Sequence, residues 1–415
     1  MSRIIIQNGN MCELDLPLKF AQKLYAEFAI RHPNAFYLRT RQRGMQNWDG
    51  KIHYITKTGQ FKIGLLPKVY DMCIEMGIKP KVVDMRQPLP KVSKVVTNIG
   101  KYKLRPEQEK AVKAVINNKI GNTPFHIGVL DYTVNAGKTL IMSSLYLSYK
   151  KQLKTLLITN DSDWLNQARE EFKQYLPGED ITFVQGKVLN WSNFTIGMVQ
   201  SISRNMRFYQ KELSQIDMVL VDEADQGGSK QYQNVITRLF NTRIRIGLSG
   251  TIYMSKLAKD KVKNMNLECF FGKVIAEFKL KDSIKKGYST KTVVKMVPGK
   301  PWYGNWESDC ISYKEIYDDS ITNCYTAWLM AYNRLLWNLN QGRYPALVVC
   351  KHIAHCENLY KFFKKKLGDA YNIAYVHVNT PSKLRQQIMR DFREGKIDIL
   401  VSTTIIARGK NFPKL

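Results

Sequence analysis

Six short apolar segments, separated by stretches of helical periodicity, constrain the fold of this chain more than any other feature. They are rich in Val, Ile and Leu: FHIGVLDY (125–132), KTLLIT (154–159), ITFVQG (181–186), FTIGMVQ (194–200), MVLVDEAD (218–225) and RIRIGLSG (243–250). Continuous apolar runs of this length are typical of strands in a parallel sheet that has helices on both faces. A second set follows at ALVVC (346–350), YNIAYVHV (371–378) and KIDILVSTT (396–404). We therefore predict an α/β chain with two parallel-sheet lobes.

The first quarter of the chain has a different pattern. RIIIQ predicts a short strand, residues 16–31 a helix, residues 50–66 two strands around Thr58-Gly59, and residues 67–77 a helix that ends at Gly77. Residues 79–94 hold three prolines and five basic residues, which predicts a linker. We predict a small basic α+β domain over 1–90, a first lobe over 91–275, and a connecting segment with the second lobe over 276–415.

Charge points to the class of partner. The chain has 64 Lys and Arg against 35 Asp and Glu, a formal net charge of +29. Residues 1–105 alone hold 19 basic and 7 acidic residues. A balance this basic indicates a polyanion, and nucleic acid is the first candidate; a solubilising surface is the alternative.

One basic stretch is a candidate nucleic-acid contact. Arg39, Arg41 and Arg43 alternate with other residues, so a strand would place all three on one face. Lys51 follows, and Trp48 is close enough to stack on a base. Such a face would bind phosphates without reading sequence. The alternative is a solvated strand face with Trp48 in the core.

The segment DYTVNAGKTL (131–140) resembles the phosphate-binding pattern G-x-x-x-x-G-K-[ST], but Tyr132 stands where the first glycine belongs. It lies between a predicted strand and a predicted helix, as that pattern requires. Lys138 is expected to reach the β- and γ-phosphates, and the Thr139 hydroxyl to bind Mg²⁺. Chance alone could supply AGKT in a lysine-rich chain.

The acidic end of MVLVDEAD strengthens this interpretation. Asp222 is placed to hold Mg²⁺, and Glu223 to orient the attacking water. A strand that merely exits into an acidic turn is the alternative. The two elements together predict a nucleoside triphosphatase.

These segments resemble the motifs of superfamily 2 helicases, and VDEAD (221–225) resembles the DEAD/DExH box. Further matches follow in order along the chain: LRPEQEKAV (104–112), ITNDSDWLNQ (158–167), FTIGMVQSI (194–202), LSGT (248–251), ALVVCKHIAHCENLYKFF (346–363) and HVNTPSKLRQQIMRDFREGKIDILVSTTIIARGKNFP (377–413). The first loop position varies in this superfamily, so Tyr132 does not disqualify the loop.

The resemblance implies roles for individual residues. It implies nucleotide contacts from Arg105, Gln108 (to the base), Asn135, Ala136, Gly137, Lys138, Thr139 and Asp222. It implies that Ser249 and Thr251 couple the phosphate site to closure of the lobes. It implies nucleic-acid contacts from Gln167, Gln200, Lys351, Thr403 and Arg408.

The basic first domain resembles that of the phage UvsW-like DNA helicases, most closely in NWDGKI (47–52) and GLLPKVYDMCIEMG (64–77). That resemblance implies two RecA-like lobes, ATP and Mg²⁺ as cofactors, and branched, duplex and single-stranded DNA as partners. Branch migration, fork regression and D-loop or R-loop unwinding would be the activities. It further implies a monomer that works with recombination or replication proteins. The N-terminus lacks the apolar stretch of a signal peptide, which predicts a cytoplasmic location.

Three alternatives and one expectation about the chain end remain. A DEAD-type RNA helicase is disfavoured for two reasons: LSGT stands where those proteins usually have SAT, and ITNDSDWLNQ lacks their PTRELA motif. A non-hydrolysing binder of branched DNA is disfavoured by the intact Lys138 and Glu223. The cluster CKHIAHC (350–356) could hold a metal ion only in a tight loop. The sequence stops inside or just past the segment that resembles motif V of this superfamily (377–413). We therefore expect the second lobe to be incomplete and to lack the superfamily's next segment, motif VI, whose arginines reach the γ-phosphate.

Overall fold

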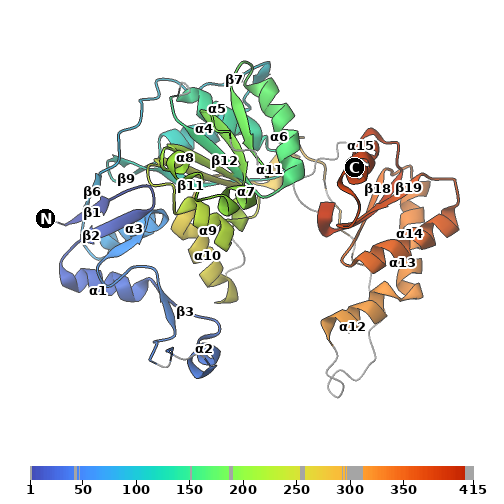
Figure 1. The fold of residues 1–415 in the computed structure, drawn as a ribbon, viewed down its shortest axis with the longest axis horizontal. Coiled ribbons are helices and arrows are strands. Elements are labelled where there is room, and N and C mark those ends of the chain that lie inside the picture. Colours follow the sequence, from blue (N-terminus) through green and yellow to red (C-terminus); the bar gives the residue numbers. More distant parts are fainter. Residues whose placement is uncertain are drawn as a thin grey trace. The chain divides into compact units, whose positions relative to one another are not determined.

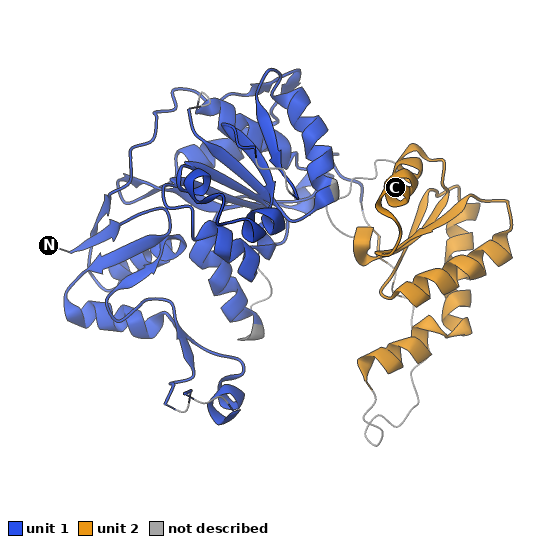
Figure 2. Cartoon of the chain, viewed as in Figure 1, with its two compact units in different colours: residues 1–291 blue, residues 292–415 orange. Residues whose placement is uncertain are grey.

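The computed structural model describes residues 2–41, 44–45, 47–149, 152–186, 190–252, 258–291, 293–294, 296 and 312–406. The chain divides into two compact units, residues 1–291 and 292–415 (Figure 2). The predicted α/β class with two parallel-sheet lobes is confirmed: one parallel sheet lies in each unit.

The first unit is built on a seven-stranded, all-parallel sheet in the order β13-β14-β12-β15-β16-β11-β17. Its strands are β11 (His126–Tyr132), β12 (Thr155–Thr159), β13 (Ile181–Val184), β14 (Phe194–Met198), β15 (Met218–Asp222), β16 (Ile244–Ser249) and β17 (Val274–Phe278). The first six are the six predicted apolar runs. The seventh, β17, spans residue 275, and the end of the first lobe at that residue stays a prediction.

Side chains of successive strand residues enter two separate apolar layers, one on each face of the sheet. In β15, Val219 and Val221 belong to one layer, and Met218 and Leu220 to the other. This period of two is why the strands read as continuous apolar runs. The helices that cover the Leu220 face are α4 (Pro106–Ile116), α5 (Lys138–Ser148) and α6 (Ser162–Tyr175). Those on the Val219 face are α7 (Val199–Arg204), α8 (Gln210–Ser214), α9 (Lys230–Ile236) and α10 (Ala258–Phe271).

A four-stranded sheet, in the order β5-β2-β1-β6, forms the N-terminal part (Figure 1). Its elements are β1 (Arg3–Ile6), β2 (Met11–Asp15), β5 (Gln60–Lys62), β6 (Lys81–Asp84), α1 (Leu18–Glu27) and α3 (Leu66–Glu75). The prediction of a linker over 79–94 was wrong at its start, because β6 pairs in parallel with β1. Val82 is buried there, but the lysines and prolines around it hide the strand pattern. The remaining short elements of the unit are η1 (Ile63–Leu65), β7 (Asn98–Ile99), β8 (Tyr102–Lys103), β9 (Lys119–Ile120), β10 (Thr123–Pro124), η2 (Ala224–Gln226) and α11 (Leu280–Lys285).

The N-terminal sheet shares an apolar core with the seven-stranded sheet. Ile4, Ile6 and Phe61 lie in the same buried cluster as Val219 and Val221. The predicted domain boundary near residue 90 therefore runs through a region of shared packing, and it stays a prediction.

A buried arginine joins the two sheets. Arg245 of β16 is fully buried, and its guanidinium donates hydrogen bonds to the carbonyl of Gly9 (2.6 Å), Oδ1 of Asn10 (2.8 Å) and the carbonyl of Phe270 (3.2 Å). Burial lowers the pKa of Arg245 to about 9. The backbones also touch: a Cβ on Gly64 would lie 2.1 Å from the carbonyl oxygen of Glu268. Only glycine fits at that contact.

A two-stranded ribbon extends from this part of the unit and carries a short helix (Figure 1). Strands β3 (Ala29–Arg31) and β4 (Lys51–His53) pair antiparallel, and helix α2 (Ala35–Arg41) lies in the connection between them. We call residues 29–53 the arm.

The second unit holds a three-stranded parallel sheet in the order β18-β20-β19. Its elements are η3 (Asp318–Thr322), η4 (Thr404–Ile406), α12 (Tyr313–Tyr317), α13 (Tyr325–Asn340), β18 (Ala346–Cys350), α14 (Ile353–Leu367), β19 (Ile373–Val376), α15 (Ser382–Glu394) and β20 (Ile399–Thr403). Val401 packs with Phe363 on one face, and Leu400 with Phe392 on the other. Among the helices in the described ranges, none has the length and apolarity needed to cross a bilayer.

Candidate nucleotide and nucleic-acid sites

The candidate phosphate loop connects the carboxyl end of β11 to the first turn of α5. Asn135 and Gly137 have positive φ angles of 62° and 74°, and Gly137 is the N-cap of α5. Left-handed residues within a loop turn successive N–H groups towards one side, and the first N–H groups of α5 lack helical partners. The loop and helix can therefore present a row of N–H donors to an anion.

Tyr132 does not enter the loop. Its side chain is fully buried in the core between the sheet and α4, and its hydroxyl donates a hydrogen bond to the carbonyl of Glu107 at 2.8 Å. The side chain at the first loop position is thus part of the apolar core.

Gln108 and Arg105 brace the loop from α4. Nε2 of Gln108 donates to the carbonyl of Ala136 (2.8 Å), and its Oε1 accepts from the main-chain N–H of Arg105 (2.8 Å). The Arg105 guanidinium donates to the carbonyl of Asn135 (3.1 Å). A Cβ on Gly137 would lie 2.2 Å from Nε2 of Gln108, so this brace fits only glycine. Gln108 is 1% exposed, and its contact with a base stays a prediction.

Two carboxylates face Lys138. Its Nζ lies 3.8 Å from Oδ1 of Asp222 and 3.8 Å from Oε1 of Glu223. Asp222 ends β15, and Glu223 follows with φ 51° and ψ 51°, a left-handed conformation that is rare outside glycine and asparagine. Lys138, Asp222 and Glu223, which are far apart in the sequence, therefore meet at the carboxyl edge of the sheet.

Asp222 is poised to take up a cation. Burial raises the pKa of Asp222 to about 6, the Lys138 ammonium lowers it, and Glu223 raises it. Its Oδ1 is buried and makes no hydrogen bond within the described part of the chain. A buried, unsatisfied carboxylate oxygen beside a hydroxyl-bearing loop suits Mg²⁺, which prefers oxygen ligands.

Ser249 contacts the acidic segment that follows β15, and Thr251 contacts Ser249. Oγ of Ser249 donates to Oδ1 of Asp225 at 3.4 Å and accepts from the main-chain N–H of Thr251 at 3.2 Å. The LSGT segment is therefore linked to VDEAD by a side-chain hydrogen bond across neighbouring strands.

The structure adds contacts that the sequence did not indicate. The segment after β17 is attached to α4 and β11: Lys286 Nζ pairs with Glu107 at 2.8 Å, and Lys279 pairs with Asp131. The ring of Tyr288 lies against the Arg105 guanidinium, 4.2 Å from ring centroid to Cζ. No local sequence signal could have found Tyr288, because 182 residues separate it from Arg105.

The arm corrects one prediction. Arg39 and Arg41 lie on helix α2 and not on a strand, so their side chains project about 200° apart around the helix axis. The alternation of arginines with other residues predicts a strand, but residues 35–41 form a helix of about two turns within the connection of residues 32–50 between β3 and β4. Arg43 lies outside the described residues.

Trp48 and Lys51 also lie on the arm. The Trp48 indole N–H donates to the carbonyl of Lys51 (2.9 Å), and its ring meets that of His32 edge-on, 5.7 Å between centroids. Trp48 is half-buried and closes the loop before β4, while the Lys51 side chain is exposed.

Of the remaining predicted nucleic-acid contacts, Gln200, Lys351 and Thr403 lie at the carboxyl ends of strands. In the first unit, Gln167 lies on α6 and donates to Glu171 (2.6 Å), and Gln200 donates to the carbonyl of Asn160 (3.3 Å). In the second unit, Lys351 follows β18 and Thr403 ends β20. Arg408 lies outside the described residues.

The CKHIAHC segment forms hydrogen-bonded and aromatic contacts. Cys350 and Cys356 are buried, and a hydrogen bond from Cys350 lowers the pKa of Cys356. The rings of His352 and His355 both meet Tyr317 edge-on. Within the described ranges, no three His, Cys, Asp or Glu side chains come close enough to hold a metal ion.

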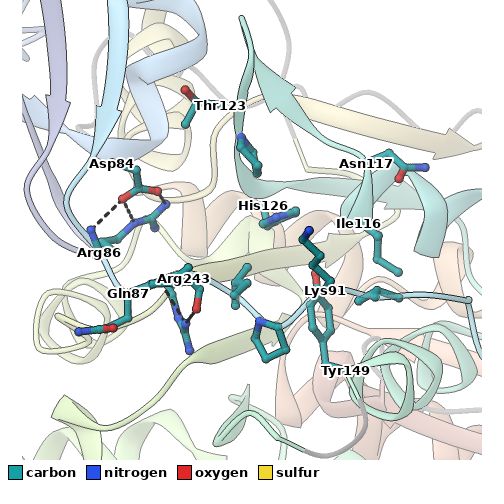
Figure 3. Close-up of a pocket in the computed structure, with 15 residues that line it drawn as sticks. Asp84, Arg86, Gln87, Lys91, Ile116, Asn117, Thr123, His126, Tyr149 and Arg243 are labelled. Carbon is teal, nitrogen blue, oxygen red and sulfur yellow. Dashed lines mark hydrogen bonds and ion pairs between the residues drawn. The ribbon is translucent and has the colours of Figure 1, made fainter.

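A cavity of about 570 Å³ lies at the other end of the seven-stranded sheet (Figure 3). His126, the first residue of β11, and Arg243, which precedes β16, line it beneath residues 84–92. Ligands of parallel α/β sheets bind at the carboxyl ends of the strands. This cavity is therefore separate from the nucleotide site.

Two family models match the chain. "Type III restriction enzyme, res subunit" matches residues 101–254, and "Helicase conserved C-terminal domain" matches residues 329–415. The competence protein ComFA of Bacillus subtilis is 22% identical over 281 residues, covering 68% of this chain and 53% of ComFA. The ATP-dependent RNA helicase RhlB of Shewanella woodyi is 36% identical over 78 residues, covering 18% of this chain and 17% of RhlB. The chain thus spans about half or less of these curated relatives.

Solved helicases share the fold. One structure of UvsW from bacteriophage T4 aligns with a TM-score of 0.53 and 19% identity, covering 100% of this chain and 82% of that one. Dbp5 of S. cerevisiae, bound to RNA, aligns with a TM-score of 0.52 and 15% identity, covering 75% and 73% of the two chains. With the phosphate loop, the VDEAD carboxylates and both family models in agreement, the chain belongs to the superfamily 2 helicases.

Proposed function

We propose that this chain is an ATP-dependent DNA helicase that acts on branched DNA during recombination and repair. The observation that carries the proposal is the meeting of Lys138 with Asp222 and Glu223 at the carboxyl edge of a helicase-type sheet. DNA binding alone would not require the buried carboxylate of Asp222 next to the phosphate loop, with its pKa raised to about 6.

The loop and its surroundings fit a nucleoside triphosphate with Mg²⁺. The N–H groups between Asn135 and Thr139 would bind phosphate oxygens, and the Lys138 ammonium would leave its two carboxylates for the β- and γ-phosphates. The Thr139 hydroxyl and Asp222 would hold Mg²⁺, which supplies charge neutralisation between the phosphates when bound. Arg105, whose guanidinium contacts the ring of Tyr288, would lie near the base of the bound nucleotide.

Glu223 would hold the attacking water. Its carboxylate is about one-third exposed and lies beside Lys138, so it can accept a hydrogen bond from a water molecule that enters from solvent. Ser249 and Thr251 would transmit the state of this site, because Ser249 is hydrogen-bonded to Asp225 of the same acidic segment.

DNA as the substrate rests on the first domain and the resemblance to UvsW-like helicases. The fold match with T4 UvsW extends over the whole chain, including the arm and the N-terminal sheet. The basic side chains Arg39, Arg41 and Lys51 would bind phosphates there. Gln167 and Gln200 in the first lobe, and Lys351, Thr403 and Arg408 in the second, would contact a single strand.

An RNA helicase is the second candidate. The partial match to RhlB and the fold shared with RNA-bound Dbp5 favour it. The extent of the matches favours the first candidate, because the Dbp5 match covers 75% of this chain and the UvsW match covers all of it. A monomeric state, a cytoplasmic location and recombination or replication partners stay predictions.

The deciding experiment measures ATP hydrolysis with single-stranded DNA, duplex DNA, forked DNA, four-way DNA and single-stranded RNA side by side. We expect the largest stimulation with forked or four-way DNA. Equal or greater stimulation by RNA would favour the second candidate. Tight DNA binding without any hydrolysis would identify a binder that uses the helicase fold as a clamp.

A further inference from the structure

The arm exposes an aromatic ring that the fold does not use. The side chain of Phe36, on α2, is 80% exposed. Burial of such a side chain would stabilise the protein relative to exposure, and Phe36 makes no such contribution here. Its neighbour Ala35 is buried and anchors the helix, whereas Phe36 contributes its ring to no core cluster among the described residues.

Three basic side chains line the same groove as this ring. Phe36 lines a groove of about 480 Å³ together with Arg31, Arg39 and Lys51, and all three basic side chains are exposed. Arg39 is three positions after Phe36, one turn further along the same side of α2. Within the described part of the chain, no carboxylate forms a salt bridge with Arg31, Arg39 or Lys51. The one acid in the groove, Asp49, is paired with His53 at 2.6 Å, and that hydrogen bond lowers the pKa of Asp49.

The neighbouring aromatic is arranged differently. Tyr37 is 54% exposed, the Arg41 guanidinium lies 4.7 Å from its ring centroid, and Nη1 of Arg41 donates to its hydroxyl at 3.3 Å. One face of the Tyr37 ring is therefore already occupied. Trp48 is half-buried and uses its N–H within the arm.

An exposed aromatic ring beside basic side chains that form no salt bridge within the described part of the chain matches the chemistry of an unpaired nucleotide. The base stacks on the ring, and the flanking phosphates meet the basic side chains. A base inside an intact duplex offers its edges but not its faces, so this arrangement needs a strand that has left the duplex.

We propose that Phe36 is a stacking site for an unpaired base, with Arg31, Arg39 and Lys51 holding the phosphates beside it. The arm then binds the point where duplex DNA opens. This inference rests on the proposed function for its biological setting, because helicase action on branched DNA supplies such unpaired bases.

The test uses the full chain without nucleotide and a forked DNA that carries 2-aminopurine at successive positions of its unpaired arms. Wild-type protein is expected to change the fluorescence at one or two adjacent positions near the fork. Phe36→Ala should abolish that change and weaken fork binding about 10-fold, the scale of one base-stacking contact. Binding to a fully paired duplex of equal length should stay within about two-fold of wild type.

Matched variants separate stacking from other effects. Phe36→Trp should retain the fluorescence change, whereas Phe36→Leu, which is apolar but has no ring, should lose it. Tyr37→Ala on the same helix should have the smaller effect, because Arg41 covers that ring. Phe240→Ala removes an exposed phenylalanine near the amino-terminal edge of the large sheet and should change nothing.

Three results would overturn the proposal: equal loss of fork and duplex binding in Phe36→Ala, no loss in either, or Phe36→Leu behaving like Phe36→Trp. The ATPase assay distinguishes this failure from that of the proposed function. If Phe36→Ala binds forks normally and DNA still stimulates hydrolysis, the arm proposal fails alone. If DNA stimulates no hydrolysis in wild type, the proposed function fails, and the fluorescence result still decides the role of Phe36.

Discussion

The hydroxyl of Tyr132 donates a hydrogen bond to the main-chain carbonyl of Glu107, which ties the last residue of β11 to the first turn of α4. Phosphate loops usually begin with glycine at the position of Tyr132. Here the ring is buried between the sheet and α4. Because α4 also carries Gln108, whose amide holds the loop at Ala136, Tyr132 supports the loop from beneath.

Restoring the glycine should therefore destabilise the protein. Tyr132→Gly removes a fully buried aromatic side chain, and we expect a loss of at least about 3–5 kcal/mol in the free energy of unfolding of the first unit. Tyr132→Phe removes only the hydroxyl and should cost about 0.5–1.5 kcal/mol. Urea denaturation followed by tryptophan fluorescence measures both. A glycine variant as stable as wild type would mean that Tyr132 does not fill this core.

The nucleotide site should separate hydrolysis from DNA binding. Lys138→Ala should lower ATP turnover by on the order of 10²–10³-fold, because the phosphates lose their positive partner. Glu223→Gln should keep ATP binding but lower turnover by about 10²–10⁴-fold, since the amide holds the water less well. Steady-state ATPase and equilibrium DNA binding are the measurements. Lys113→Ala, an exposed lysine paired with Glu109 on α4, is the control and should retain full hydrolysis. Normal ATP turnover in Lys138→Ala would mean that the segment around Lys138 is not the phosphate-binding loop.

The pKa of Asp222 predicts the acid limb of the activity profile. Burial raises this pKa to about 6 in the nucleotide-free protein, so the carboxyl is protonated below that pH and cannot bind Mg²⁺. We expect kcat/KM for ATP to fall as the pH drops through about 6. Because Mg²⁺ and the proton compete for one oxygen, a higher Mg²⁺ concentration should shift the fall to lower pH. If the pH at which kcat/KM falls did not change with the Mg²⁺ concentration, a group other than Asp222 would be responsible for the fall.

The raised pKa of Asp222 also makes the free energy of unfolding depend on pH, but stability rises as the pH falls, whereas activity decreases. Asp222 has a higher pKa folded than unfolded, so the folded state binds its proton more tightly. The stabilising contribution of protonated Asp222 is complete below about pH 4 and is lost as the pH rises through about 6. Asp222→Asn should remove this part of the pH dependence in denaturation experiments.

The sequence predicted the strands of both parallel sheets. Buried strands on a parallel sheet leave unbroken apolar runs, so six strands of the large sheet and all three of the small one were found. The sequence could predict that Lys138, Asp222 and Glu223 lie close together, because each follows or ends such a strand and parallel strands place their carboxyl ends at one edge. Their roles stay predictions.

What the sequence could not show depends on contacts between distant residues. Strand β6 was missed because lysines and prolines surround its single buried valine, and its pairing partner β1 lies almost 80 residues away. Tyr288 and Arg245 were missed for the same reason, since each meets residues far away in the chain. On the arm, a helix of two turns carried too few residues for its period to outweigh an accidental alternation of arginines.

The geometry of α2 predicts unequal roles for its two arginines in the salt dependence of DNA binding. Arg39 is exposed and lines the groove with Phe36, whereas Arg41 projects to the other side of the helix and lies over Tyr37. Each phosphate contact contributes about 0.9 to the slope of log K against log salt concentration on duplex DNA. We expect Arg39→Ala to lower the slope by close to one contact and Arg41→Ala to lower it by clearly less. Lys19→Ala, on the exposed face of α1, is the control for a general loss of charge.

Had α2 been a strand, both arginines would face the same phosphates, so equal changes in slope for Arg39→Ala and Arg41→Ala would contradict the helical arm. An unchanged slope in both would mean that the arm does not touch the DNA backbone.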